Sequence, residues 1–474
     1  MKTLLPVLLI SVLAAGCAVG PHYHRPEVAA PDALRGSDAA AGAASLADQS
    51  WWQLLGDEAL RSLIEEALRE GHDVELAAWR VEEARAQLGV ARSELFPQVQ
   101  GGAGWARGRQ SAAVSPFTET ADLYDVDLGL SWEIDLWGRI RRLKQAALAR
   151  YLASEEARRG VLLSLVSDVA TGYFRLRALD HQLEIARRTS EAFEGTRTLF
   201  RDRLEAGLAS SLETSSADAA HASTLASIPD LERRIVEQEN QLALLLGRRP
   251  GEVRRGDELN DQLLPPEIPA GLPSELLERR PDLRQAEREL MAANADVGVA
   301  VADHFPRISL TGVFGGVAPE VGDLFGEGKS WSVGGGLLTP VLQGDRLSRQ
   351  HRAAVARWEQ ARVRYERSVT NAFVEVSTAL VAYRKLAEAE EEQTRAVSAY
   401  REAVSLANSR YLSGLADYLE VLQAQQQLFP AETTLARTRL ERLVTLVELY
   451  RALGGGWQLD DAEWSGPGAK READ

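Results

Sequence analysis

The sequence predicts a mainly α-helical protein with a transmembrane β-barrel portion, built from two tandem repeats that each supply two strands. Three observations lead to this prediction. The chain of 474 residues aligns with itself over two halves. Each half contains a stretch in which apolar and polar residues alternate, as they do in strands. Each half also contains a long segment without proline, in which apolar residues recur at helical spacing.

Composition narrows the classes of function. The chain has 54 Lys and Arg residues against 69 Asp and Glu residues, a net charge of −15. This balance argues against a nucleic-acid partner, because binding nucleic acid needs basic surface. The single cysteine excludes intrachain disulfides and cysteine-rich metal sites.

The N-terminus has the pattern of a signal peptide over residues 1–16. Lys2 gives the positive start, Leu4–Leu13 the apolar stretch, and Ala14–Gly16 the small residues before cleavage. Cys17 follows at once, and the pattern resembles the lipobox of bacterial lipoproteins, whose cysteine is acylated. We expect a covalent lipid on Cys17, no other cofactor, and a lipidated N-terminal segment over residues 17–50. The alternative is an ordinary signal peptide beside an incidental thiol.

The two halves share residues in the same order. The matches include Asp73-Val74 with Asp282-Leu283, Gly89–Ala91 with Gly298–Ala300, and Phe96-Pro97 with Phe305-Pro306. We place the first repeat at 51–263 and the second at 274–457. The proline-rich residues 264–273 form the linker between them, and residues 458–474 form a flexible tail. Each half is predicted to contain a helix, two strands, a long helix and a further helix. Asp73 and Pro281 are the predicted starts of the opening helices.

The strands are expected at about 97–136 and 306–341. Residues 125–136 alternate strictly, which is typical of a transmembrane β-strand with one face in lipid and the other in a wet lumen. If the apolar face meets lipid, then Asp127, Glu133 and Asp135 face the lumen, where a ring of carboxylates would favour cations. A soluble antiparallel sheet with one solvated face is the alternative.

The helical hairpins are expected at about 139–247 and 345–453. Their apolar residues are spaced by three and four, so each long helix should pack along a partner helix. Gly207 and Gly414 interrupt the two segments and mark the turns. The four strands are too few to close a barrel, because membrane barrels need at least eight and leave no open edge in lipid. Copies of the chain must therefore combine their strands; two copies would supply eight and three copies twelve.

Motifs along most of the chain resemble the TolC-like outer-membrane factor family, in its NodT/OprM branch of efflux lipoproteins. The stretches that carry the resemblance are Cys17–Tyr23 with Arg25-Pro26, Trp51-Trp52 with Gly56-Asp57, Arg280–Arg284, and Asn294–Ala300. The resemblance implies a homotrimer with a twelve-stranded barrel in the outer membrane joined to a twelve-helix α-barrel in the periplasm. It also implies a periplasmic adaptor and an inner-membrane pump, commonly of the RND class, as partners.

The two turns are the predicted docking sites for the adaptor. The residues that match the tips of the family are Arg203, Gly207, Leu208, Ser210, Arg410, Gly414 and Leu415. Simple helix termination would explain the glycines, but it would not explain the arginine four residues before each one. Leu412 and Asp417 lie close to the second turn, where the family constricts its closed tunnel, and are candidate gate residues.

No motif of an enzyme is visible, and no metal site is expected. His22 and His24 could ligate a metal as a pair, but two ligands on a tether are more often incidental. The leading function is therefore an outer-membrane exit duct for small molecules. One alternative is the outer-membrane duct of a type I protein secretion system. Another, of a different class, is a periplasmic adaptor or structural lipoprotein, which would lack the alternating strands.

Overall fold

The computed structural model describes residues 18–29, 31, 33–36, 45–109, 120–265, 268–269, 271, 273–459 and 463–464. The predicted signal peptide and Cys17 lie outside these described residues. The chain forms two compact units. The first, which we call the sheet unit, comprises residues 1–27, 79–155 and 285–367. The second, the helical unit, comprises residues 28–78, 156–284 and 368–474.

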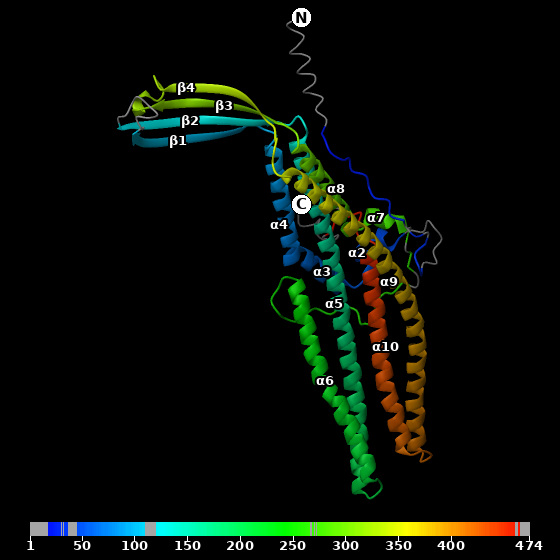
Figure 1. Cartoon of the computed structure of the whole chain (residues 1–474). Helices are drawn as coiled ribbons and strands as arrows, with labels where there is room; N and C mark the ends of the chain where they lie inside the picture. The colour runs from blue at the N-terminus through cyan, green and yellow to red at the C-terminus, as the bar shows by residue number, and fades with distance from the viewer. Residues whose placement is uncertain are drawn as a thin grey trace. The chain divides into compact units, whose positions relative to one another are not determined.

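The sheet unit contains one four-stranded antiparallel sheet in the order β1-β2-β3-β4 (Figure 1). The strands are β1 (Gln98–Arg109), β2 (Thr120–Ile134), β3 (Arg307–Ala318) and β4 (Lys329–Leu338). The short helix η3 (Val321–Asp323) lies between β3 and β4. Each repeat supplies one neighbouring pair, and the pairing of β2 with β3 joins the repeats.

Each strand pair follows a helix of the same length. Helix α4 (His72–Ser93) precedes β1, and α8 (Pro281–Ala302) precedes β3; both have 22 residues. Pro281 is the first residue of α8, where its fixed φ suits the helix and its missing N–H has no intrahelical partner to lose. The predicted starts at Asp73 and Pro281 therefore agree with the structure to within one residue.

The long helices are as extended as the sequence predicts. Helices α5 (Arg139–Glu205) and α9 (Arg346–Leu412) each have 67 residues, which corresponds to a length of about 100 Å. They are followed by α6 (Ser211–Leu245) and α10 (Tyr418–Ala452), each of 35 residues. Figure 1 shows α6 running back beside α5 and α10 beside α9. Among the described residues, no helix has an apolar stretch long enough to cross a bilayer.

Short helices complete the core of the helical unit. They are η1 (Leu46–Asp48), α2 (Trp51–Leu54), α3 (Glu58–Glu70), η2 (Pro273–Glu275) and α7 (Leu276–Arg279). Trp51 and Leu60 from these segments are fully buried against Tyr173 of α5, Leu242 of α6 and Leu449 of α10. The apolar face of α3 therefore belongs to the same hydrophobic core as the buried residues of both hairpins.

A buried carboxylate fixes the loop that follows α6. Asp57 is only 2% exposed and caps α3 through the amides of Ala59 and Leu60. It also accepts hydrogen bonds from the Tyr173 hydroxyl at 2.8 Å and the Gln262 amide at 2.9 Å. Burial alone would raise the pKa of Asp57, but the hydrogen bonds outweigh it and hold the pKa below its ordinary value of 3.8.

The end of the chain differs from the prediction. We expected residues 458–474 to be a flexible tail, but Trp464 is 3% exposed and its carbonyl accepts a hydrogen bond from the Trp51 indole at 3.2 Å. The large apolar ring of Trp464 packs beside Gly456, where a side chain would come within 2.9 Å of the ring. This part of the tail is therefore an ordered element of the helical core.

Candidate functional site

The register of the sheet sorts side chains onto two different faces. One face is apolar and aromatic. Its large apolar residues are Val99, Trp105, Tyr124, Val126, Leu128, Leu130, Trp132, Ile134, Ile308, Leu310, Phe314, Trp331, Val333 and Leu337. Charged residues on this face, Arg107, Arg109, Asp122 and Lys329, lie toward one end of the sheet. Most of the apolar residues are exposed in the single chain, Val333 at 79% and Trp331 at 72%. An exposed apolar face of this extent needs an apolar environment or a partner.

The opposite face carries mainly small and polar residues, with Leu123, Val313, Val317 and Leu338 as apolar exceptions. The polar residues include Gln98, Gln100, Asp125, Asp127, Ser131, Ser309, Thr311, Ser330 and Ser332. Glycines leave space for the two aspartates: a Cβ added at Gly102 would lie 2.9 Å from an Asp127 carboxylate oxygen, and one at Gly104 would lie 2.5 Å from an Asp125 oxygen. The strict alternation predicted for residues 125–136 is present in the part of this stretch that forms β2, whereas β3 and β4 follow it less strictly.

The sheet ends at a junction rich in tryptophan. The Trp132 indole donates to the Leu95 carbonyl at 3.1 Å, and the Trp137 indole donates to the Pro306 carbonyl at 2.8 Å. Trp137 also stacks on Phe305, with ring centroids 4.8 Å apart. Aromatic residues with one polar edge are enriched where a membrane meets water, so this junction has the composition of such a boundary.

Two of the three predicted lumen carboxylates are engaged at this junction. Glu133 forms two hydrogen bonds with Arg139, at 2.9 and 2.8 Å. Asp135 lies just beyond the end of β2 and accepts from the backbone amides of Ile140 and Arg141, so it caps α5. Asp127 makes no hydrogen bond or ion pair within the described parts of the chain. The exposure of these carboxylates to a pore stays a prediction.

The segment after Cys17 is docked inside the sheet unit. The Val19 amide donates to the Trp137 carbonyl at 3.0 Å, while Arg142 binds the carbonyls of Val19 and Gly20 at 3.1 and 3.3 Å. Gly20 has φ of +101°, and a Cβ there would lie 2.6 Å from the Cα of Gly298. Further along, the Tyr23 hydroxyl and Arg25 both bind Glu287, at 3.1 and 2.7 Å. We call residues 18–27 the strap.

The two turns of the helical unit end their long helices in the same way. Gly207 and Gly414 have φ of +72° and +71°. The next amide bonds back to the carbonyl five residues earlier: Leu208 to Arg203 at 2.8 Å, and Leu415 to Arg410 at 2.9 Å. This is the Schellman motif, which needs a residue with positive φ and so favours glycine. The turns leave Leu208 and Leu415 exposed at 75% and 73%.

The two predicted arginines have different partners. The Arg203 guanidinium lies over the Tyr411 ring, 5.0 Å from its centroid, and donates to the Tyr411 hydroxyl. Arg203 therefore links the first turn to the second. Arg410 instead approaches Glu420 of its own hairpin, at 3.6 Å. Burial raises the pKa of Tyr411, although the neighbouring Arg203 opposes the shift.

Aromatic residues hold the two turns together, and sequence reasoning missed them. Phe200 of α5 contacts Tyr418 edge to face, with ring centroids 4.3 Å apart, and Tyr411 lies 5.4 Å from Tyr418. Phe200 is 1% exposed and Tyr418 is 4% exposed. The sequence did contain one sign of this cluster, because Tyr411 and Tyr418 lie on either side of the predicted turn at Gly414.

The remaining predicted residues lie around this cluster. Ser210 caps α6 and forms a reciprocal capping box with Glu213. Leu412 is 81% exposed at the end of α9. Asp417 is the N-cap residue of α10, but its side chain makes no capping hydrogen bond. The first turn is therefore fixed more firmly than the second.

The described residues hold no cluster of metal ligands. No group of three or more His, Cys, Asp or Glu side chains among them is arranged to bind a metal ion. His22 and His24 are both exposed on the strap.

Comparisons with known proteins agree with this geometry. The family described as "Outer membrane efflux protein" matches residues 63–248 and 272–455, one match in each repeat. The chain is 36% identical over 466 residues to the outer membrane protein OprJ of Pseudomonas aeruginosa, covering 95% of both chains. It is 35% identical over 466 residues to the toluene efflux pump outer membrane protein TtgC of Pseudomonas putida, covering 96% of both. The solved structure of the outer-membrane channel OprN aligns with a TM-score of 0.86 and 32% identity, over 94% of this chain and 100% of that one.

Proposed function

Since the chain belongs to the outer membrane efflux protein family, we propose that it is the exit duct of a tripartite efflux system, completed by a periplasmic adaptor and an inner-membrane pump. As a member of this family it is an outer-membrane efflux channel. The duct is passive in our proposal and has no catalytic role.

The observation that carries the proposal is the two-faced sheet. Its apolar face fits lipid and its polar face fits a wet lumen. Four strands cannot close around a lumen, and β1 and β4 are edges within the single chain. We infer a homotrimer, in which β4 of one copy pairs with β1 of the next to give twelve strands. The hairpins would then supply twelve helices to a periplasmic tunnel.

The partners follow from the two turns. Exposed Leu208 and Leu415 offer an apolar contact at the end of each hairpin, and an adaptor hairpin is the proposed occupant. Leu412 and Asp417 belong to the less firmly fixed turn and are the proposed gate. The pump is of the RND class in this proposal. The relative named for toluene efflux favours small apolar molecules as the exported substrates.

The anchor in our proposal is a covalent lipid on Cys17, the residue that immediately precedes the strap in the sequence. Replacement of this residue by serine tests the proposal directly. Cys17→Ser should abolish uptake of a labelled fatty acid, while the strap contacts of Val19 and Arg142 remain available to the protein. Labelling of the variant at the level of the unchanged chain would overturn the assignment.

The duct itself is tested by conductance and assembly. The purified protein should migrate as a heat-resistant trimer in detergent and form channels in planar bilayers. A cell that lacks its own outer-membrane channel should regain drug resistance when this chain is expressed with its pump and adaptor. A monomer without conductance would contradict the proposal and would favour an adaptor or a structural lipoprotein.

A further inference from the structure

A buried carboxylate of α10 joins the two helical hairpins. Glu432 is 6% exposed. Its Oε2 atom accepts a hydrogen bond from Arg188 of α5 at 2.8 Å, and its Oε1 atom accepts two from Arg401 of α9, at 3.0 and 2.6 Å. Charge-assisted hydrogen bonds are stronger than neutral ones, and breaking a buried ion pair is strongly unfavourable. Glu432 therefore fixes α10 to both hairpins at this level, and we call these three residues the clamp.

On the side of the clamp nearer the second turn, α10 has weak points in its hydrogen bonding. Pro430 lies inside the helix and has no N–H to donate to the carbonyl of Gln426, four residues earlier. The side-chain oxygen of Gln425 is buried and has no hydrogen-bond partner among the residues that the structure describes. Such an unsatisfied atom is costly. Because helices bend most readily at a proline, this is where α10 is easiest to deform.

The apolar packing of α10 changes at the same place. On the turn side, Val421 and Leu422 belong to the cluster around Phe200 that holds the two turns together. Past the three glutamines at 425–427, Phe429 packs against a second cluster, formed by Leu179, Leu183, Ala186 and Leu231. Helix α10 thus passes from one apolar cluster to the other across three consecutive polar residues.

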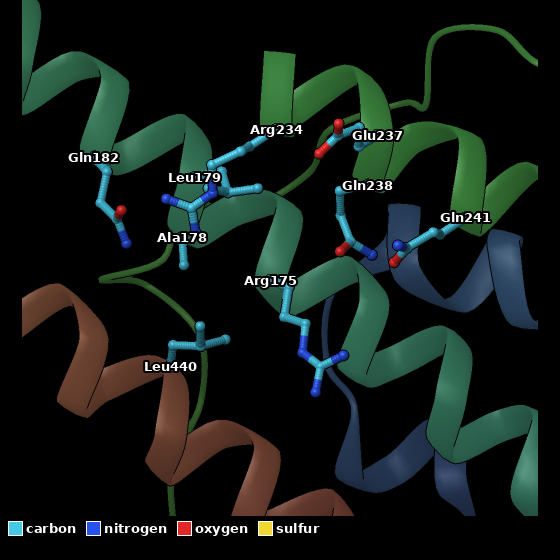
Figure 2. A pocket seen from close by; sticks show the side chains of 9 residues that line it. All are labelled: Arg175, Ala178, Leu179, Gln182, Arg234, Glu237, Gln238, Gln241 and Leu440. Atoms are coloured by element: carbon cyan, nitrogen blue, oxygen red, sulfur yellow. The ribbon is translucent and has the colours of Figure 1, made fainter. Parts of the chain in front are cut away.

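Beyond the clamp, α10 stays packed against the first hairpin. Leu440 lies about two turns past Glu432 and packs against the main core of the helical unit, which includes Ala178 of α5. Figure 2 shows Leu440 directed toward α5, where it lines the same pocket as Ala178 and Leu179. Further along α10, three leucines are fully buried in that core: Leu443, Leu446 and Leu449. The part of α10 from Glu432 onward is therefore held firmly.

The first hairpin has different residues at the corresponding positions. Helices α6 and α10 both have 35 residues, and, counted from their first residues, Ser223 and Leu225 of α6 correspond to Pro430 and Glu432. Leu225 is 49% exposed and has no group that could bind a guanidinium. Helix α6 does contain a proline, Pro229, but it lies further from its turn. The proline next to a buried clamp is thus a feature of the second repeat.

We propose that α10 has a hinge at residues 425–430 and that the clamp is the fixed side of this hinge. When the duct opens, the segment between the second turn and the hinge swings, while α10 beyond Glu432 stays in place. The second turn, with Leu412 and Asp417, lies on the moving side. The inference therefore rests on the proposed function, in which these two residues form the gate. Glu432 is a positioning residue, because it confines the movement to the end of the hairpin.

Hydrogen exchange of the purified full-length protein in detergent locates the hinge. Backbone amides that open locally exchange faster than those that open only with the whole domain. Residues 216–222 of α6 and 423–429 of α10 lie at the same distance from the starts of their helices, so fraying from the turns affects both equally. We expect residues 423–429 to exchange at least about tenfold faster than residues 216–222.

Two proline variants test the cause of the fast exchange. Pro430→Ala restores the missing donor and should slow exchange over residues 423–429 by about tenfold. It should also lower the conductance in planar bilayers severalfold, because the gate opens less readily. Pro229→Ala is the matched control, since it removes a proline from the interior of α6. It should leave both the conductance and the exchange of residues 423–429 unchanged.

Two glutamate variants test the clamp. Glu432→Gln removes the charge that Arg188 and Arg401 bind, so fast exchange should extend severalfold beyond the hinge, over residues 432–440. Glu441→Gln removes an exposed carboxylate from the same helix and should not have this effect. Circular dichroism and gel filtration check each variant. If Glu432→Gln does not fold, Arg401→Gln, at a position 61% exposed, provides the same test.

Three results would each overturn the hinge. They are equal exchange of the two matched segments, exchange that Pro430→Ala does not slow, and exchange of residues 432–440 that stays slow when the clamp is broken. Exchange does not depend on conduction. A protein with the expected exchange pattern and no conductance would therefore contradict the duct function and leave the hinge in place.

Discussion

Arg203 reaches from the turn of the first hairpin to Tyr411 of the second, where it lies 5.0 Å from the ring centroid. The two turns are thus tied to each other within one chain. We predict that Arg203→Gln weakens this tie by about 1–2 kcal/mol, since it removes a cation–π contact and a hydrogen bond. The turns should separate more readily, and single-channel conductance in planar bilayers should rise severalfold.

A matched variant distinguishes the loss of the Arg203–Tyr411 contact from the general effect of removing a positive charge. Arg410 is at the equivalent position of the second repeat, but its nearest partner is Glu420 of the same hairpin. Arg410→Gln should therefore leave the conductance close to that of the unchanged protein. Equal conductance of the two variants would contradict a special role for Arg203.

The second turn gives a prediction for adaptor docking. Gly414→Trp should abolish drug export in cells while the trimer still assembles, because the bulky ring blocks the exposed surface beside Leu415. Gly414 has φ of +71°, so any side chain strains the backbone by about 1 kcal/mol. Gly414→Ala carries the same strain without the bulk and should retain most of the export. Export that survives in the Trp variant would argue against docking at this turn.

The repeats and the element order could be predicted because their signals are local. Glycine at Gly207 and Gly414 ends a helix through backbone conformation, and Pro281 begins one. Strict alternation along β2 predicts its two faces without knowledge of its neighbours.

The contacts of the candidate site were harder to predict because they depend on packing between distant segments. Arg203 and Tyr411 are separated by 208 residues, and the local sequence around either residue does not indicate that the two are in contact. The same holds for Trp464, which the sequence places in a polar tail although the core of the helical unit contains its ring. The pairing of Glu133 with Arg139 requires the bend between β2 and α5, which alternation alone does not describe.

Asp57 should make the helical unit sensitive to acid. Its folded pKa lies below 3.8, so the ionised form is favoured by folding. The stabilisation is complete above the unfolded pKa and is lost as the pH falls toward and through the folded pKa. Asp57→Asn should cost about 3 kcal/mol at neutral pH, because several donors lose a charged acceptor. Thermal unfolding followed by circular dichroism between pH 7 and about pH 3 checks this, and the variant should show a flatter pH dependence across the acidic range.

The strap should depend on one arginine. Arg142 is 6% exposed and binds two strap carbonyls, so Arg142→Ala should release the strap without touching Cys17. Limited proteolysis followed by mass spectrometry should show severalfold faster cleavage among residues 18–36, while acylation is kept. Arg150→Ala is the control, because Arg150 pairs with Asp296 in the same unit and forms no hydrogen bond or ion pair with the strap residues that the structure describes. Equal cleavage of both variants would show that the strap is held by other contacts.

Neighbouring residues of β4 test the orientation of the sheet. Val333 lies on the apolar face, paired with Gly312, and Ser332 lies on the polar face, paired with Val313. If the apolar face meets lipid, Val333→Arg places a charge in the bilayer and should cost about 2–4 kcal/mol near its midplane. Ser332→Arg points the same charge into water and should cost far less. Urea unfolding of the protein in lipid vesicles measures both, and a larger loss for the Ser332 variant would mean that the faces are reversed.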